Sequence, residues 1–408
     1  MKEKEKTESV FWGLDIGTES VKSAIIGKRR SKNGPENFVL AASLQYFERY
    51  GVFDGRNLED DVARKAISKS IQETKRNLFL CSQAERDLKK RVEREKRINA
   101  VVSLSADRIK TRISSPTILR DRPEEKISKS EEERIIGEAI RQSKNEAAEK
   151  FSVKSGVTAS EIKWLGFKAI ERKIDGYSLP KIQGYKGRKI DFRILIVFTA
   201  DYYLETLSRV LDPLRIDISK IASPAENLNR SCGALTESGV FLDIGGDVTQ
   251  FLITEKGLKA GGEIETGARA FTECLCRSFG LDEESSRNLK ERYASRSLSV
   301  ESAERIKELF RREKESWYRH LEEAILEESG KRIPFSDFRL FGGGSILPDI
   351  KEVLERNFGE TRDDISFFPD FEIKTIYPKD LSDFKNLTDN AATPQFVPLL
   401  LSLSSRQG

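Results

Sequence analysis

One short pattern occurs twice in this chain, and its two copies lie more than 200 residues apart. Residues 13–27 read GLDIGTESVKSAIIG and residues 241–255 read FLDIGGDVTQFLITE. Each copy consists of an apolar strand, Asp-Ile-Gly, a few small or polar residues and a second apolar strand. Repeat proteins have periods of about 20–50 residues, so this wider spacing predicts two duplicated lobes with one hairpin each. Glycine in each turn permits positive φ and a close approach of other groups to the backbone.

Length and charge are compatible with two lobes and exclude several classes of protein. A chain of 408 residues with 38% hydrophobic content is too long for one ordinary core. Its 71 basic and 67 acidic residues leave a net charge of +4, which gives no sustained field for a nucleic-acid backbone, so we expect no nucleic-acid partner. The sequence shows no run of about eighteen apolar residues and no signal-type segment at its start, which predicts a cytoplasmic protein.

Cysteine and histidine usage limits the available chemistry. Four cysteines in a chain of this size fit a reducing compartment. The Cys-Leu-Cys formed by Cys274 and Cys276 favours ordinary packing over metal binding, because His320 is the only histidine and the usual zinc ligands are missing. The single histidine also argues against most catalytic triads, so any acid or base must be a carboxylate, a lysine or water.

The two hairpins carry groups that bind polyphosphate. Their glycine turns expose backbone N–H groups, and hydroxyl and ammonium groups are added by Thr18, Ser20, Thr249 and Lys22. Asp15 and Asp243 would repel phosphate by themselves, so they are expected to hold Mg²⁺ through its water ligands. A single Asp-Ile-Gly after a strand is more often a simple turn; the duplication is what favours two phosphate loops.

A third glycine-rich element lies near the end of the chain. Residues 338–358, FRLFGGGSILPDIKEVLERNF, predict a buried strand, a Gly-Gly-Gly-Ser turn and an amphipathic helix. Successive glycines let a base or sugar lie against bare backbone, and the N-terminus of the following helix favours anionic groups. Taken alone, this segment fits a plain β–α connection equally well.

The middle of the chain has a different character from the segments around it. From about Ser115 a polar linker leads through a predicted capping box at Ser130 and Glu133 into an amphipathic helix. A strand-like segment and the Gly/Pro-rich residues 177–189, YSLPKIQGYKGRK, follow before the buried strand 192–200. This order predicts a small subdomain inserted in the first lobe.

The phosphate-loop segments DIGTESVK and DIGGDVT and the segment GGGS, in this order, resemble the actin-like ATPase superfamily. Within it the chain resembles the FtsA family of bacterial cell-division proteins over nearly its whole length, and the insertion resembles the SHS2-type subdomain of that family, called 1C. The implied fold is α/β and actin-like, with two lobes of duplicated ribonuclease-H-like domains and an inserted SHS2-type subdomain. The implied domains are 9–115 and 193–222 for the first lobe, 116–192 for the insertion, and 223–400 for the second lobe, with about 265–330 as its smaller helical subdomain.

The resemblance also implies a ligand and partners. It implies ATP with Mg²⁺ in the cleft between the lobes, recruitment to the C-terminal peptide of FtsZ, self-association into filaments, and linkage of the division ring at the septum to the membrane. Residues that match the phosphate loops are Asp15, Gly17, Thr18, Ser20, Lys22, Asp243, Gly245, Gly246 and Thr249, with Asp15 and Asp243 holding Mg²⁺ through water. Residues that match the adenosine site are Lys290, Gly342, Gly343, Gly344 and Ser345.

Two positions depart from the superfamily pattern. Asp247 replaces the usual third glycine of the second loop, where it either contacts metal-bound water or caps the turn. Ser223 stands where actin-like chaperones carry a glutamate that positions the attacking water, and a helix starting at Pro224 would direct Glu226 elsewhere. The chain is therefore expected to bind ATP and to be at most a weak ATPase.

Two other functions fit parts of the sequence. The terminal segment PQFVPLLLSLS corresponds to the closing helix of the second lobe, so the resemblance does not extend to the membrane-binding helix that ends FtsA proteins. A type IV pilus assembly protein like PilM, which shares the lobes and a similar insertion, would instead bind a peptide from an inner-membrane partner. In either role the protein would reach the inner face of the membrane through partners. A sugar or acetate kinase would need an aspartate base for its acceptor, and the sequence offers no convincing one.

Overall fold

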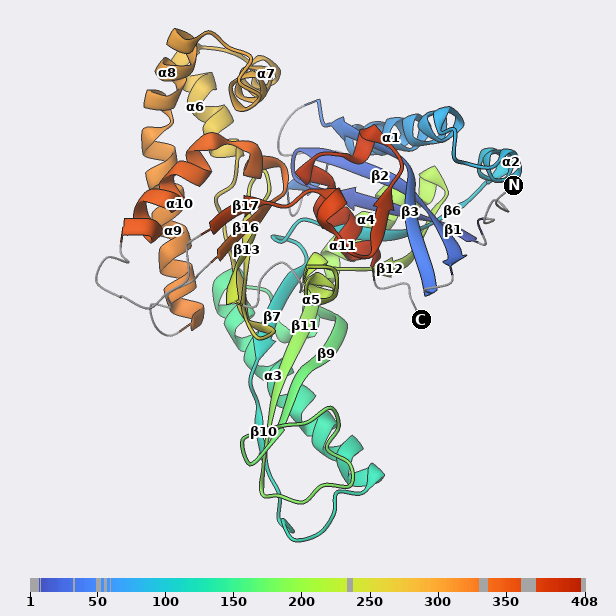
Figure 1. The fold of residues 1–408 in the computed structure, drawn as a ribbon, viewed down its shortest axis with the longest axis vertical. Helices are drawn as coiled ribbons and strands as arrows, with labels where there is room; N and C mark the ends of the chain where they lie inside the picture. The colour runs from blue at the N-terminus through green and yellow to red at the C-terminus, as the bar shows by residue number, and fades with distance from the viewer. Residues whose placement is uncertain are drawn as a thin grey trace.

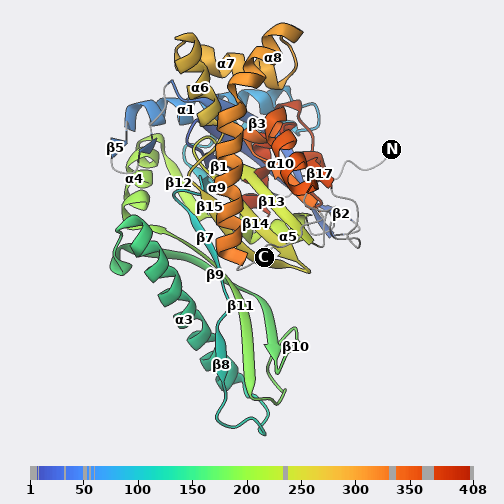
Figure 2. The same ribbon diagram turned by 90° about the vertical axis from the view of Figure 1, so that its left-hand side faces the viewer.

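The computed structural model describes residues 7, 9–31, 34–48, 53–54, 57–58, 60–232, 238–329, 337–360 and 372–404. Its strands form a six-stranded sheet, two five-stranded sheets and a short two-stranded ribbon, β4 (Phe53–Asp54) with β5 (Asn57–Leu58). Two of the larger sheets lie side by side with helices around them, and the third extends away from both (Figures 1 and 2). No described helix combines the length and the apolar character that a membrane crossing requires.

The first sheet has the order β12-β6-β1-β2-β3-β18, in which β18 is Phe384–Asn386. Three consecutive strands form an antiparallel meander, β6 lies parallel beside β1, and β12 lies parallel beside β6. Helices α1, α2 and α4 pack around this sheet. In the buried interface, Ser23 of β2 hydrogen-bonds to Ser70 and Thr74 of α1. The elements are β1 (Ser9–Ile16), β2 (Ser20–Ser31), β3 (Gly34–Tyr46), β6 (Ile98–Leu104), β12 (Ile216–Ile221), α1 (Asp60–Leu80), α2 (Arg86–Arg94) and α4 (Asp201–Leu211).

The second sheet repeats this plan in the order β15-β14-β13-β16-β17. Its antiparallel strands are β13 (Ser238–Ile244), β14 (Thr249–Glu255) and β15 (Leu258–Ile264), and β16 (Asp337–Phe341) and β17 (Glu372–Thr375) continue it in parallel. Because the same meander is followed by the same parallel extension, the predicted duplication is confirmed. The helices of this half are α6 (Arg269–Phe279), α7 (Glu283–Ala294), α8 (Val300–Leu309), α9 (Arg311–Ser329) and α10 (Pro348–Glu360).

The third sheet and one long helix form the part that projects downward in Figure 1. Its strands are β7 (Lys110–Ser114), β8 (Thr117–Leu119), β9 (Ile162–Ile174), β10 (Tyr177–Ser178) and β11 (Lys189–Ala200), and α3 (Lys129–Ser155) packs on them. The helix begins after Ser128, whose hydroxyl accepts a hydrogen bond from the Glu131 N–H group at 3.2 Å. The predicted cap at Ser130 is therefore wrong by two residues.

The last part of the chain returns to the first sheet. Strand β18 (Phe384–Asn386) pairs in parallel with β3, and α11 (Val397–Leu403) packs against β1 and β6. The sequence predicted that this segment belongs to the second lobe, residues 223–400. The reason for the difference is a close contact across the fold: a Cβ atom added to Gly13 of β1 would lie 2.5 Å from a methyl carbon of Leu403. Glycine at that position makes room for the helix.

Candidate functional site

The two hairpins have the same local geometry. In the first, Ile16 pairs with Val21 and the Gly17 N–H group donates to the Ser20 carbonyl at 2.9 Å. In the second, the corresponding pair is Ile244 with Thr249, and Gly245 donates to Val248 at 2.9 Å. The turns 17–20 and 245–248 are thus equivalent in structure, which the aligned sequences predicted.

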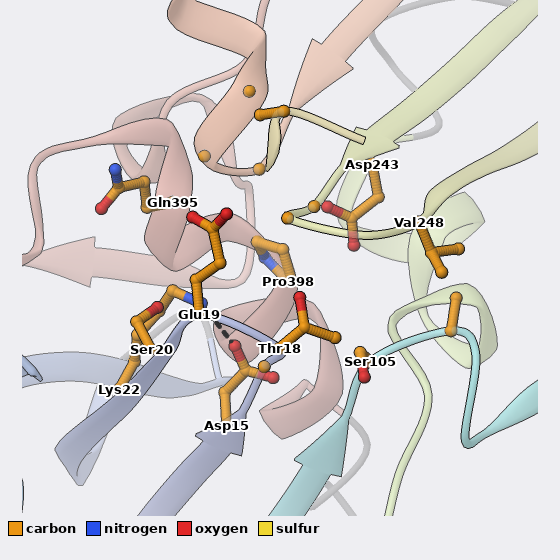
Figure 3. Close-up of a pocket in the computed structure, with 18 of the residues that line it drawn as sticks. Asp15, Thr18, Glu19, Ser20, Lys22, Ser105, Asp243, Val248, Gln395 and Pro398 are labelled. Atoms are coloured by element: carbon orange, nitrogen blue, oxygen red, sulfur yellow. Dashed lines mark hydrogen bonds and ion pairs between the residues drawn. The ribbon is translucent and has the colours of Figure 1, made fainter. Parts of the chain in front are cut away.

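The tips of these hairpins meet beside a cavity that residues of both turns line (Figure 3). The Asp247 N–H group donates to the Thr18 hydroxyl at 3.2 Å. A Cβ atom added to Gly246 would lie 2.6 Å from the Thr18 hydroxyl oxygen and 2.6 Å from Cγ of Glu19. A side chain at position 246 would therefore push the two hairpins apart.

The start of helix α6 fixes the direction of the second turn. The Ala268 and Arg269 N–H groups donate to the carbonyls of Gly245 and Gly246 at 2.9 and 2.8 Å. Because the peptide unit is planar and trans, the N–H groups of Gly246 and Asp247 point the opposite way, toward the first hairpin. The turn thus presents its N–H groups, which suit an anion, where the hairpins meet.

Two carboxylates lie at the bases of the hairpins. Asp15 forms an ion pair with Lys22, with 2.7 Å between Oδ2 and Nζ. Burial, with a smaller contribution from the negative charge of Asp15, raises the pKa of Asp243 to about 7, and Lys22 opposes the shift. A divalent cation would relieve this repulsion, so the donor set fits Mg²⁺. Within the described residues no group of three or more His, Cys, Asp or Glu side chains converges on one point, so water and phosphate oxygens would supply the remaining ligands.

The glycine-rich turn after β16 closes the cavity from the side of the second sheet. Gly342 has φ of +84°, and a Cβ atom there would lie 2.4 Å from Oδ1 of Asp243. At Gly343 the nearest atom would be Cγ of Gln395 at 3.7 Å, which is an ordinary contact. Buried Lys290 of α7 also lines the cavity, where its ammonium group donates to the Ala268 carbonyl at 3.0 Å and burial lowers its pKa.

Most of the predicted site residues lie around this single cavity. Those that line it are Asp15, Gly17, Thr18, Ser20, Lys22, Asp243, Gly245, Gly246, Lys290, Gly342, Gly343 and Gly344. Thr249 and Ser345 do not line it. The Ser345 hydroxyl is buried and donates to the Gly342 carbonyl at 2.8 Å, so it stabilises the turn.

Several residues that line the cavity were not predicted from the sequence, among them Glu19, Tyr46, Gln250, Arg287, Glu291 and Gln395. On helix α7, Arg287 lies three residues before Lys290 and Glu291 lies four residues after Arg287, so helical spacing starting from the predicted lysine could have identified them in turn. Tyr46 of the first sheet hydrogen-bonds to Glu291 at 2.7 Å and stacks on the Arg287 guanidinium, which lies 4.6 Å from the ring centre. No local sequence signal marks this contact, because it joins β3 to a helix of the other half.

Comparisons with known proteins place this geometry in a fold class. No protein-family model and no curated protein sequence matches the chain. Among solved structures, a PilM-PilN type IV pilus biogenesis complex matches with a TM-score of 0.62 at 16% identity, over 96% of this chain and 97% of that one. The chain has the actin-like fold.

Two other structures are less similar. The ethanolamine utilization protein EutJ from Carboxydothermus hydrogenoformans has a TM-score of 0.48 at 13% identity, over 98% of this chain and 92% of that one. MreB5 of Spiroplasma citri bound to ADP has a TM-score of 0.39 at 11% identity, over 98% and 96%.

The two departures from the superfamily pattern have clear structural positions. Asp247 forms an ion pair with Arg269, with 2.6 Å between Oδ1 and Nη1. Ser223 lines the cavity and its hydroxyl lies 2.9 Å from that of Thr111. Glu226 accepts the Ser223 N–H group and pairs with Lys220, both at 3.0 Å, so its carboxylate is held away from the cavity, as the sequence predicted.

Thr249 is expected to contribute to the stability of the fold and not to nucleotide binding. Its buried hydroxyl donates to the Thr266 carbonyl at 2.8 Å and accepts the Trp317 indole N–H at 2.9 Å. Thr249→Val leaves both groups without this partner, so we expect the free energy of unfolding to fall by about 1–3 kcal/mol. Affinity for Mg-ATP, measured by titration calorimetry, should stay within about twofold, because Thr249 does not line the cavity. A large loss of affinity with unchanged stability would contradict this role.

Proposed function

We propose that the chain is an ATP-binding scaffold of the actin-like type. The observation that carries the proposal is that two equivalent hairpins meet beside one cavity, each with an aspartate at its base and N–H groups at its tip. The glycine turn at 342–344 and Lys290 line the same cavity, where the resemblance places the adenosine. The three elements therefore support one nucleotide site.

The residues have distinct tasks in this site. The turn N–H groups and the hydroxyls of Thr18 and Ser20 bind phosphate oxygens, and Lys22 supplies a positive charge. Mg²⁺, when bound, neutralises phosphate charge, and Asp15 and Asp243 hold its water ligands. Ser223 offers no carboxylate to orient an attacking water, so we expect very slow turnover and at most a weak ATPase.

Binding of Mg-ATP is the direct test. We expect purified protein to bind Mg-ATP in titration calorimetry and to melt at a higher temperature with it, because a ligand that binds only the folded state stabilises it. Lys22→Ala should weaken binding by about tenfold, whereas Lys28→Ala, farther along the same strand, should leave it unchanged. If wild-type protein shows neither heat nor a melting shift with Mg-ATP, the proposed function fails.

A PilM-like role is supported by the structural similarity over almost the whole of both chains. In this role the chain binds a short segment of an inner-membrane partner and stays at the inner face of the membrane through it. The second candidate is the FtsA-type role, which is supported by the sequence of the first lobe and of residues 116–192, proposed here as an SHS2-type subdomain. That role adds the C-terminal peptide of FtsZ as a partner and self-association into filaments at the septum.

Peptide binding separates the two roles. Fluorescence anisotropy with labelled cytoplasmic peptides of pilus inner-membrane proteins and with an FtsZ C-terminal peptide should show binding to the first group only. Scrambled peptides of the same composition serve as controls. Specific binding of the FtsZ peptide alone would reverse the order of the candidates.

A further inference from the structure

Arg269 joins the two phosphate hairpins. It is the first residue of α6, and its side chain is only 14% exposed. The guanidinium pairs with Asp247 at 2.6 Å, donates to the Thr18 carbonyl at 3.1 Å and lies 3.7 Å from Oε1 of Glu19. One arginine of the second half therefore contacts the turns of both hairpins.

Its two carboxylate neighbours occupy equivalent positions. When the pairs Ile16–Val21 and Ile244–Thr249 are matched, Glu19 and Asp247 are each the third residue of their turn. Carboxylates at the tips of two phosphate loops oppose phosphate binding unless a cation accompanies them. Oε1 of Glu19 is buried and accepts no hydrogen bond from the described residues. Arg269 therefore offsets the negative charge of Glu19 without hydrogen-bonding to this oxygen.

Arg269 lies next to the proposed phosphate site. Thr18 and Glu19, which its guanidinium contacts, line the cavity, whereas Arg269 and Asp247 lie just outside its lining. The Asp247 N–H group donates to the Thr18 hydroxyl. Two hydrogen-bond donors, this N–H group and the hydroxyl, therefore lie together where the hairpins meet. A phosphate at that point would take those donors and lie beside the guanidinium. Arginine binds phosphate through two parallel hydrogen bonds, and the phosphate carries more charge than either carboxylate.

We infer that Arg269 contacts the terminal phosphate of the nucleotide and makes the chain prefer ATP to ADP. Without this phosphate, Glu19 and Asp247 hold the guanidinium between the hairpins. ADP lacks the group that replaces these carboxylates, so Arg269 adds nothing to its affinity. The inference rests on the proposed nucleotide site and adds its selectivity.

Calorimetric titration with Mg-ADP and with a non-hydrolysable Mg-ATP analogue tests the inference. Arg269→Gln should weaken analogue binding by about tenfold or more and change ADP binding by less than about twofold. Arg277→Gln is the matched control, because Arg277 lies on the same helix, is 64% exposed and pairs with Glu273 and Glu313. Its ratio of the two affinities should equal that of wild type.

A second variant tests the same claim from the other side. Glu19→Gln combined with Asp247→Asn frees Arg269 from its carboxylates, so affinity for the analogue should rise by about fivefold or more, with a smaller change for ADP. This variant decides the question if Arg269→Gln does not fold. If the variants change the affinities for ADP and for the analogue by the same factor, the inference fails while the proposed function stands. Wild-type protein that binds neither nucleotide would overturn the proposed function together with it.

Discussion

Glu263→Gln is expected to lower the free energy of unfolding by about 3–4 kcal/mol, because it removes the negative partner of two largely buried cations. Glu263 lies on β15 and is 9% exposed, and its carboxylate accepts two hydrogen bonds from Arg112, at 2.6 and 2.8 Å, and one from Lys110 at 3.0 Å. Both cations belong to β7 of the third sheet. The change should therefore destabilise the junction between the third sheet and the second, as measured by urea unfolding.

The control for this change is Glu355→Gln on α10, where the glutamate is 53% exposed and pairs with Lys351. Exposed helix pairs contribute little, so its free energy of unfolding should not change measurably. A loss for Glu263→Gln as small as that of the control would show that the junction is open to water in solution.

The contribution of Glu263 and its two cations to stability depends on pH through the pKa of Glu263. Burial alone would raise it, but Arg112 and Lys110 lower the pKa to about 2 from an ordinary value of 4.5. A lowered pKa means that the carboxylate stabilises the folded state fully above pH 4.5 and loses this effect as the pH falls toward 2. The difference in unfolding free energy between wild type and Glu263→Gln should therefore narrow between pH 4.5 and 2.

The hairpins were predictable because their signals are local. Strand alternation and glycine placement define each turn, and the alignment of the two copies predicted that they would match. The same alternation could have corrected the assignment of Thr249, since Thr249, Phe251 and Ile253 share one face of β14, which packs in the core of the second half. Gln250, on the other face, lines the cavity. The position of a residue within its strand, more than its hydroxyl group, decides which side it faces.

The remaining features depend on contacts between distant segments. In the sequence, Arg269 looks like an ordinary helix residue; only the fold brings both hairpins into contact with it. Likewise, the sequence assigns α11 to the second lobe, and only the fold shows that Gly13 leaves room for it against the first sheet. In the same way, Ser128 and Ser130 are equally good caps by sequence. The ion pair of Glu131 with buried Arg120 accompanies the cap at Ser128. Such choices are made by tertiary packing, which composition and spacing do not encode directly.

Gly342→Ala is expected to weaken Mg-ATP binding by about tenfold to a hundredfold, because the added methyl group has no room beside a proposed magnesium-binding aspartate. The Cβ atom would lie 2.4 Å from Oδ1 of Asp243 and 2.7 Å from the Ile244 carbonyl oxygen, and the residue would keep φ of +84° only under strain. Either the turn or Asp243 must move. The strain should also lower the free energy of unfolding by about 1–3 kcal/mol.

Gly137→Ala on α3 is a control that lies outside the cavity. Its Cβ atom would have no other atom within 4 Å. Titration calorimetry with Mg-ATP should therefore give wild-type affinity for Gly137→Ala and a large loss for Gly342→Ala. Since both variants add the same methyl group, equal affinities would mean that the position of Asp243 does not matter for binding. The role proposed for that aspartate in holding Mg²⁺ would then be wrong, while the phosphate contacts of the two hairpins would be left in place.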